Sequence, residues 1–148
     1  MDWGSFYPPP LAGIRVKFDF DVIVLSVIWS YNVDLYQNLF EGYTFYYDLP
    51  ETGNVGGVGI FVKNTIKQNQ LDNVKVQSTD CCRLESVWLE ISKGRRNYII
   101  GGVYRHPGQD IDKFTNNIEK TLLQLQKSKL PCFIVYDINP YPGKWGVK

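Results

Sequence analysis

The sequence has few of the residues that zinc, disulfide and redox sites require. It contains one histidine and three cysteines, Cys81, Cys82 and Cys132, and neither a Cys-x-x-Cys nor a His-Glu-x-x-His pattern. Adjacent cysteines rarely pair with each other, and an odd number is not a disulfide framework. We therefore expect no zinc site and no fold that depends on disulfides.

An excess of charge and long apolar runs are also missing. Sixteen basic and 15 acidic residues leave a net charge of +1, too little for a general attraction to nucleic acid or anionic lipid. The longest mostly apolar run, residues 22–29, is too short to cross a bilayer. The first residues, MDWGSFYPPP, lack the basic and apolar regions of a signal peptide. We expect a chain of the nucleus or cytoplasm that is not secreted.

The composition is that of one globular domain. Of 148 residues, 44% are hydrophobic and 15% aromatic, and a chain of this length buries roughly 70% of its unfolded surface. Three consecutive prolines exclude a helix or central strand near the start, so residues 1–18 are predicted to be irregular. Residues 22–29 form a nearly continuous β-branched run, typical of a strand covered on both faces. Residues 31–54, rich in Tyr, Asn and Asp, are predicted as a loop with one short helix.

The second half of the chain predicts a mixed α/β fold. Apolar and polar residues alternate as in strands over residues 57–63, 86–92 and 98–104. A helical period follows, with an apolar stripe made of Ile111, Phe114, Ile118, Leu122 and Leu125. Asp110 or Asp112 is the predicted N-cap, and a buried strand is expected at 132–136. These patterns indicate a mostly antiparallel mixed sheet with one clear helix at about 111–128.

Polar residues that suit phosphate chemistry stand at the ends of two predicted strands. Asp137 and Asn139 end the last strand and point the same way in an extended chain, while Tyr104 and Arg105 end another. A carboxylate holds Mg²⁺, and Arg binds phosphate in a bidentate manner. The alternative is that Asp137 and Asn139 are turn residues, Tyr104 is a core-edge residue and Arg105 is solvated.

Two further sequence features suggest catalysis or phosphate binding, but each is better explained by a simpler structural role. His106 is a potential general base, but the sequence offers it no obvious partner, and a surface position before Pro107 is expected. The glycine-rich residues 53–59 suggest a phosphate cradle but lack the Gly-Lys-Ser/Thr ending of a P-loop and precede a strand. A tight turn is predicted there.

Together, and in this order, the segments resemble a known family. The stretches GGVGIFVKN, LESVWLEI, YIIGGVYRHPGQDIDKF and CFIVYDIN resemble the endonuclease/exonuclease/phosphatase family. They are most similar to the endonuclease domain of non-LTR (LINE-type) retrotransposon polyproteins. The resemblance covers roughly residues 19–139 and leaves residues 140–148 as an unmatched tail.

The resemblance implies a four-layer α/β sandwich and Mg²⁺-dependent cleavage of phosphodiesters. In retrotransposons, that activity nicks target DNA to prime reverse transcription, so DNA is the implied partner. Asp137 and Asn139 match the family's Asp and Asn, which orient the nucleophile and the scissile phosphate, and Asp137 is the matching metal ligand. Tyr104 matches a tyrosine that contacts the phosphate, and Arg105 matches its neighbour.

Several positions depart from the family pattern. The family's metal-binding Glu falls at Val27, and Tyr136 replaces a glycine before Asp137. The family's second half, with a further Asp and a final Asp-His pair, does not follow Asn139. We therefore expect a truncated domain that has lost cleavage and does not hold Mg²⁺ tightly. We also expect little more than one sheet, with an exposed apolar face and an edge that invites self-association.

Two alternatives remain open from the sequence. One is an active minimal nuclease in which another carboxylate replaces the missing ligand; the candidates are Asp19, Asp21, Glu41 and Asp48. The other is a non-catalytic module that binds nucleic acid through Arg105 and Lys63, or a protein through its open sheet.

Overall fold

The described residues form two β-sheets, two α-helices and a short 3-10 helix. The computed structural model describes residues 19–28, 33–51, 53, 55–74, 76 and 83–138. The elements, in chain order, are β1 (Val22–Ser26), α1 (Val33–Gln37), β2 (Tyr43–Asp48), β3 (Val58–Lys63), β4 (Lys67–Gln70), the 3-10 helix η2 (Asp72–Val74), β5 (Leu84–Lys93), β6 (Arg96–Arg105), α2 (Ile111–Gln126) and β7 (Cys132–Ile138). One sheet has the order β1-β3-β2 and the other β4-β5-β6-β7. Neighbouring strands are antiparallel except β6 and β7, which are parallel and joined through α2.

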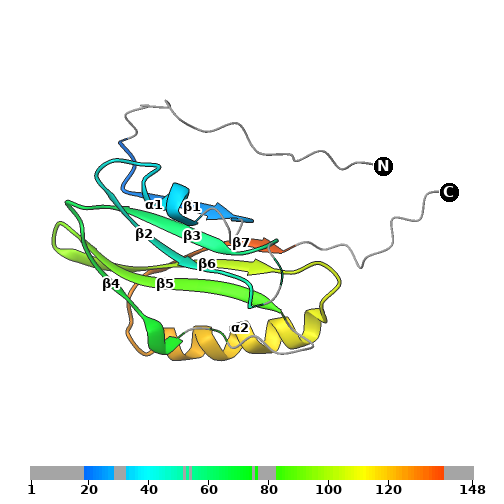
Figure 1. The fold of residues 1–148 in the computed structure, drawn as a ribbon. Helices are drawn as coiled ribbons and strands as arrows, with labels where there is room; N and C mark the ends of the chain where they lie inside the picture. The colour runs from blue at the N-terminus through cyan, green and yellow to red at the C-terminus, as the bar shows by residue number, and fades with distance from the viewer. Residues whose placement is uncertain are drawn as a thin grey trace, which may run out of the picture.

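The elements stack in four layers (Figure 1). The two sheets lie face to face, with α2 on the outer side of the four-stranded sheet and α1 on the outer side of the three-stranded sheet. The predicted mixed α/β sandwich is therefore confirmed. The expectation of little more than one sheet is wrong, because β1, β2 and β3 form a second sheet that covers the inner faces of β5 and β6.

Strand alternation builds the core between the sheets. Val58, Ile60 and Val62 of β3 pack in one cluster with apolar residues of β5 and β6, namely Val87, Leu89, Ile91 and Tyr104. All of these side chains are buried. Because alternate residues of a strand point to opposite faces, the remaining β5 and β6 side chains are available to the layer containing α2.

The second core lies between the four-stranded sheet and α2. Trp88, Ile99 and Val103 cluster with Phe114 and Leu125 of the helix. Asp110 is the N-cap, as predicted, and its carboxylate accepts hydrogen bonds from the backbone N–H groups of residues 112 and 113.

The predicted apolar stripe of α2 is only partly buried. Phe114 and Leu125 are buried, Ile118 packs partly against the core, and Ile111 and Leu122 are exposed. At 100° per residue, these last two lie roughly 60–80° away from Phe114 around the helix axis, so they sit at the margins of the buried face. Thr121 occupies the centre of that face instead.

Aromatic side chains cover the outer face of the three-stranded sheet. Phe45 of β2 stacks on Phe61 of β3 at 4.3 Å between ring centroids and on Tyr36 of α1 at 6.0 Å. Phe40 meets Phe61 edge to face at 4.8 Å. The short helix in this region was predicted, but β2 was read as loop. Tyr and Phe are strong strand formers, and this signal was obscured by the polar residues around them.

β1 and β7 lie at the margins of their sheets. Residues 22–29 were predicted to form a strand covered on both faces, and residues 132–136 a buried strand. β1 is partly buried and ends at Ser26, and most β7 side chains are exposed. Both strands pair on one side only among the residues that the structure describes. A run of apolar residues does not distinguish a marginal strand from a central one, because neighbours along the sheet are set by tertiary pairing.

Several predicted features lie outside the described residues. They are the irregular segment 1–18, the cysteines Cys81 and Cys82, the candidate Asn139 and the tail 140–148. Within the described part of the chain, no helix has both the length and the apolar character needed to span a membrane.

The packing of Trp88 against β6 predicts a strong effect for a small substitution. A methyl group at Gly101 would lie 2.2 Å from Trp88 Cζ3, so Gly101→Ala should lower the free energy of unfolding by about 1–3 kcal/mol. Urea denaturation measures this loss. The same substitution in a Trp88→Leu background should cost less, because the clashing ring is gone. Equal costs in both backgrounds would contradict this account.

Candidate functional site

Strand register brings two rows of residues face to face at one end of the sandwich. In the four-stranded sheet, Glu85 pairs with Tyr104, which pairs with Asp137. In the three-stranded sheet, Ser26 and Asp48 flank Val58. The first row points towards the second because Tyr104 belongs to the core between the sheets and residues in register share a face.

Two hydrogen bonds join the sheets at this end. Ser26 Oγ donates to Asp137 Oδ2 at 3.3 Å. The backbone N–H of Gly57, next to Val58, donates to Glu85 Oε2 at 3.2 Å. The two sheets are therefore tied together at this end by polar contacts as well as by apolar packing.

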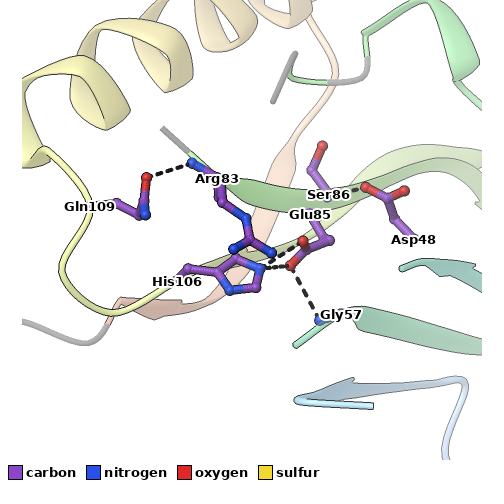
Figure 2. A network of polar contacts seen from close by, with 7 residues as sticks. All are labelled: Asp48, Gly57, Arg83, Glu85, Ser86, His106 and Gln109. Carbon is purple, nitrogen blue, oxygen red and sulfur yellow. Dashed lines mark hydrogen bonds and ion pairs between the residues drawn. The ribbon is translucent and has the colours of Figure 1, made fainter. Parts of the chain in front are cut away.

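Glu85 and His106 form a buried pair at the centre of this network (Figure 2). His106 Nε2 lies 2.8 Å from Glu85 Oε1 and 2.9 Å from Oε2. Glu85 is 3% exposed and His106 is 9% exposed. Burial raises the pKa of the Glu85 carboxyl, and the bond to His106 opposes that rise. Figure 2 also shows the Ser86 N–H, which donates to Asp48 Oδ2 at 2.9 Å.

The prediction that His106 is a surface residue is wrong. Its partner was not obvious from the sequence, although a signal was present. Glu85 occupies an inward position of β5, in line with Val87 and Leu89, and His106 continues the inward series of Tyr104. An acidic residue at an inward position needs a partner, and the register places His106 beside it.

The backbone N–H of Gly57, in the glycine-rich segment, reaches Glu85 because Gly57 has an unusual backbone conformation. Gly57 has φ +93°, and a Cβ there would lie 2.8 Å from Ile28 Cγ1. Such a φ and such crowding are tolerated by glycine alone among the common residues. The glycine-rich segment leads into a strand, β3, as expected, and it also supplies a donor to the buried carboxylate.

Tyr104 is placed where the sequence predicted a strand-end phenol. Its ring meets His106 edge to face at 5.1 Å between centroids. Burial raises the pKa of its phenol, and the charges of Asp137 and Glu85 raise it further. Tyr104 therefore remains a neutral hydrogen-bond donor beside two carboxylates.

Arg105 lies on the other face of β6 and does not join Tyr104 and Asp137. It is 3% exposed, its Nη1 donates to the Gln109 carbonyl at 2.7 Å, and its guanidinium carbon lies 5.9 Å from the centre of the Phe114 ring. The Arg83 N–H also donates to the Gln109 side chain, at 3.0 Å. In this arrangement, Arg105 holds the loop that leads into α2.

Val27 occupies the position next to the Ser26–Asp137 contact. Its N–H donates to the Gly57 carbonyl at 2.8 Å, and its side chain packs against the core between the sheets. Its φ of 56° is left-handed, which is rare for a β-branched residue and costs about 1–3 kcal/mol.

The described residues do not make a suitable Mg²⁺ site. Mg²⁺ needs an octahedron of oxygen atoms. Asp137 is exposed and bonded to Ser26, and Val27 adds no ligand. Among the residues that the structure describes, no three His, Cys, Asp or Glu side chains form a group that could hold a metal.

Comparison with known proteins identifies the fold. No protein-family model matches the sequence, and no curated protein sequence matches it. Among solved structures, the human Nocturnin catalytic domain with bound sulfate superposes with a TM-score of 0.59 at 18% identity, over 84% of this chain and 53% of that one. The chain has the endonuclease/exonuclease/phosphatase fold.

The likeness concerns fold only, and it covers part of the larger domain. The chain spans about half the length of the Nocturnin chain that it matches. A second structure, D. rerio TDP2 humanized by 14 mutations, has a TM-score of 0.47 at 12% identity, over 78% of this chain and 47% of that one. Nocturnin and TDP2 both belong to the endonuclease/exonuclease/phosphatase superfamily.

The carboxylates considered as replacement ligands do not gather at Asp137. Asp19 and Asp21 precede β1, whose other end is Ser26, and they form ion pairs with Lys63 and Lys93. Asp48 lies at the same end of the sandwich as Asp137 but accepts from Ser86 N–H, two strands from Ser26. Glu41 precedes β2, which ends at Asp48, so it lies towards the opposite end.

The buried Glu85 predicts a pH-dependent stability. Because burial raises its pKa in the folded state, the folded chain binds this proton more tightly than the unfolded chain. The contribution to the free energy of unfolding therefore falls as the pH rises from about 4.3 through the raised pKa. Glu85→Gln has no proton to lose, so its stability relative to the wild type should increase over that range.

Urea denaturation between pH 4 and pH 7.5 measures the difference between the two proteins. Glu90→Gln is the matched control, since it removes the same charge from the same strand at a more exposed position that bonds Asn97. A constant difference between Glu85→Gln and the wild type across this range would show that burial does not perturb Glu85.

Proposed function

We propose that this chain is an endonuclease/exonuclease/phosphatase-fold domain, related to the DNA-nicking endonuclease of non-LTR retrotransposons, that no longer cleaves phosphodiesters. One observation supports this most directly. Position 27, where the related endonucleases carry a metal-binding Glu, lies next to the Ser26–Asp137 contact and holds a valine.

The geometry explains why this single position matters. Ser26 Oγ and Asp137 Oδ2 are 3.3 Å apart, and Val27 is the next residue in the chain after Ser26. A glutamate there would bring a second carboxylate to the end of β7. Valine instead packs into the core. Loss of a metal ligand is expected to lower the rate of a metal-dependent hydrolysis by several orders of magnitude.

The placement of Tyr104 and Asp137 also supports descent from a phosphate-binding site. Tyr104 and Asp137 are neighbours in register, and the phenol is held neutral as a donor. In the proposal, Tyr104, Asp137 and Asn139 correspond to the residues that position the scissile phosphate of DNA in the related endonucleases. The register of Tyr104 and Asp137 comes with the fold, while the chemistry depends on a ligand that is missing at position 27.

A non-catalytic binding module is the second candidate, and the structure favours a protein partner over nucleic acid. The basic residues proposed to hold nucleic acid are engaged within the chain, because Lys63 pairs with Asp19 and Arg105 is buried against Gln109. β7, in contrast, exposes Phe133, Val135 and Tyr136.

Plasmid nicking tests the loss of cleavage. Purified wild-type protein, shown to unfold cooperatively, is incubated with supercoiled plasmid in Mg²⁺, with an EDTA control. Asp137→Ala, purified in parallel, reports nuclease contamination. We expect the wild type to nick no faster than Asp137→Ala. Nicking that both EDTA and Asp137→Ala abolish would refute the proposed inactivity.

Restoring the missing carboxylate should restore metal binding. We expect Val27→Glu to bind Mg²⁺ at least tenfold more tightly than the wild type in a calorimetric titration, because two carboxylates would then flank one position. Val27→Gln is the matched control with the same shape and no charge, and Asp137→Asn in the Val27→Glu background should remove the gain. Equal Mg²⁺ affinity in Val27→Glu and Val27→Gln would count against the assignment of position 27.

A further inference from the structure

Three turns meet at the end of the sandwich opposite the candidate site, on the left in Figure 1. They are the β3–β4 turn, residues 63–67, the β5–β6 turn, residues 93–96, and the α2–β7 turn, residues 127–131. Strand pairing brings them together. Lys67 pairs with Ser92, which precedes the β5–β6 turn, and the Ile99 N–H of β6 donates to the Pro131 carbonyl at 2.8 Å. The three turns therefore share one end of the four-stranded sheet.

Every charged residue in these three turns is basic. Their sequences are Lys-Asn-Thr-Ile-Lys, Lys-Gly-Arg-Arg and Lys-Ser-Lys-Leu-Pro, which contain seven cations and no carboxylate. We call this surface the basic end; its cations are Lys63, Lys67, Lys93, Arg95, Arg96, Lys127 and Lys129.

Most of the positive charge at the basic end is not neutralised by the chain. Lys63 and Lys93 form ion pairs with Asp19 and Asp21. The other carboxylates near this end are Glu41, which precedes β2, and Glu90, which accepts a hydrogen bond from Asn97. The remaining five cations are exposed, and no ion pair joins them to a carboxylate in the part of the chain that the structure describes; they are Lys67, Arg95, Arg96, Lys127 and Lys129.

The candidate-site end has the opposite charge. Over the described residues, the strand ends, turns and first turn of α2 at that end contain six carboxylates, namely Asp48, Glu51, Glu85, Asp110, Asp112 and Asp137, and three basic residues, Arg83, Arg105 and Lys113. The ten residues of β6 separate the two ends by about 30 Å, several Debye lengths at physiological salt. A chain with a net charge of +1 therefore has a basic end and an acidic end that act separately.

We infer that the basic end binds the phosphate backbone of nucleic acid, without regard to sequence and apart from the candidate site. The three spacings from β4 to β7, about 4.8 Å each, make this end about 14 Å wide. The major groove of DNA is about 12 Å wide, so cations spread over the basic end reach the phosphates of both strands. Asn64 and Thr65, exposed between Lys63 and Lys67, add side chains of the kind that bond phosphate oxygens.

A nucleic acid suits the basic end better than an acidic peptide does. Duplex DNA presents one negative charge per about 1.7 Å of its axis, whereas an extended acidic peptide presents at most one per about 3.3 Å. Lys63 and Arg105, the two cations expected from the sequence to hold nucleic acid, are engaged within the chain. The basic end needs neither of them, because its exposed cations come from other residues of the three turns.

Fluorescence anisotropy of a labelled DNA duplex of random sequence tests the basic end. The full chain is titrated in EDTA at several salt concentrations, so that binding is measured without metal-dependent cleavage and can succeed or fail independently of the nicking experiment. We expect binding at low salt. The logarithm of the association constant should fall with the logarithm of the salt concentration with a slope of about −3 to −4, which corresponds to about four phosphate contacts.

Paired substitutions locate the binding surface. Arg95→Gln/Arg96→Gln removes two cations from an exposed turn, so it should weaken binding by at least about tenfold and make the salt slope shallower by about 2. Lys127→Gln/Lys129→Gln, in a different turn, should act in the same direction. Lys113→Gln/Lys120→Gln is the matched control, because it removes the same charge from exposed positions of α2 outside the basic end. The control should bind like the wild type, and cooperative unfolding verifies that each variant is folded.

Three results would overturn the inference. The first is the absence of binding at low salt, which would mean that the exposed cations are too few to hold a duplex. The second is a control variant that binds as weakly as Arg95→Gln/Arg96→Gln, which would mean that net charge matters and the basic end does not. The third is competition by poly-glutamate that equals competition by unlabelled duplex at the same concentration of charge, which would make the surface one for acidic peptides.

Discussion

The alternation of side chains along β6 is the constraint on which the rest of this structure depends. β6 is flanked by β5 and β7, with α2 on one face and the second sheet on the other. Ile99 and Val103 therefore point to the helix, while Tyr104 points between the sheets. The same alternation separates two adjacent candidate residues: Tyr104 enters the candidate site, and Arg105 is buried beneath α2.

The register of the strands brings the residues of the candidate site together. Once Tyr104 lies between the sheets, pairing places Glu85 on one side of it and Asp137 on the other, and Ser26 and Gly57 of the second sheet meet them. The resulting cluster places buried charge between the two sheets, and His106 compensates for the cost of burying Glu85. The polar contacts of this cluster therefore help to fix the position of one sheet against the other.

The residues that hold the fold together differ from those to which the proposed function assigns chemistry. The sandwich is held by the two apolar cores and the Glu85–His106 pair, none of which needs a metal. Metal-dependent cleavage needs several oxygen ligands around the metal, and in the proposed function the valine at position 27 would leave out one of them. The residues that hold this fold together can therefore do so whether or not the chain cleaves phosphodiesters.

Local pattern was sufficient to predict the alternating strands, α2 with its Asp110 cap and the strand-end position of Tyr104, because these depend on neighbours close in the chain. The order of motifs was sufficient to predict the sandwich family, but only part of the sandwich was expected in this chain. Sequence did not reveal the second sheet, the exposure of β7, the burial of Arg105 or the partner of His106. Each depends on which strands lie side by side, and that follows from contacts between residues far apart in the chain: Glu85 meets His106 only after β5 and β6 have paired.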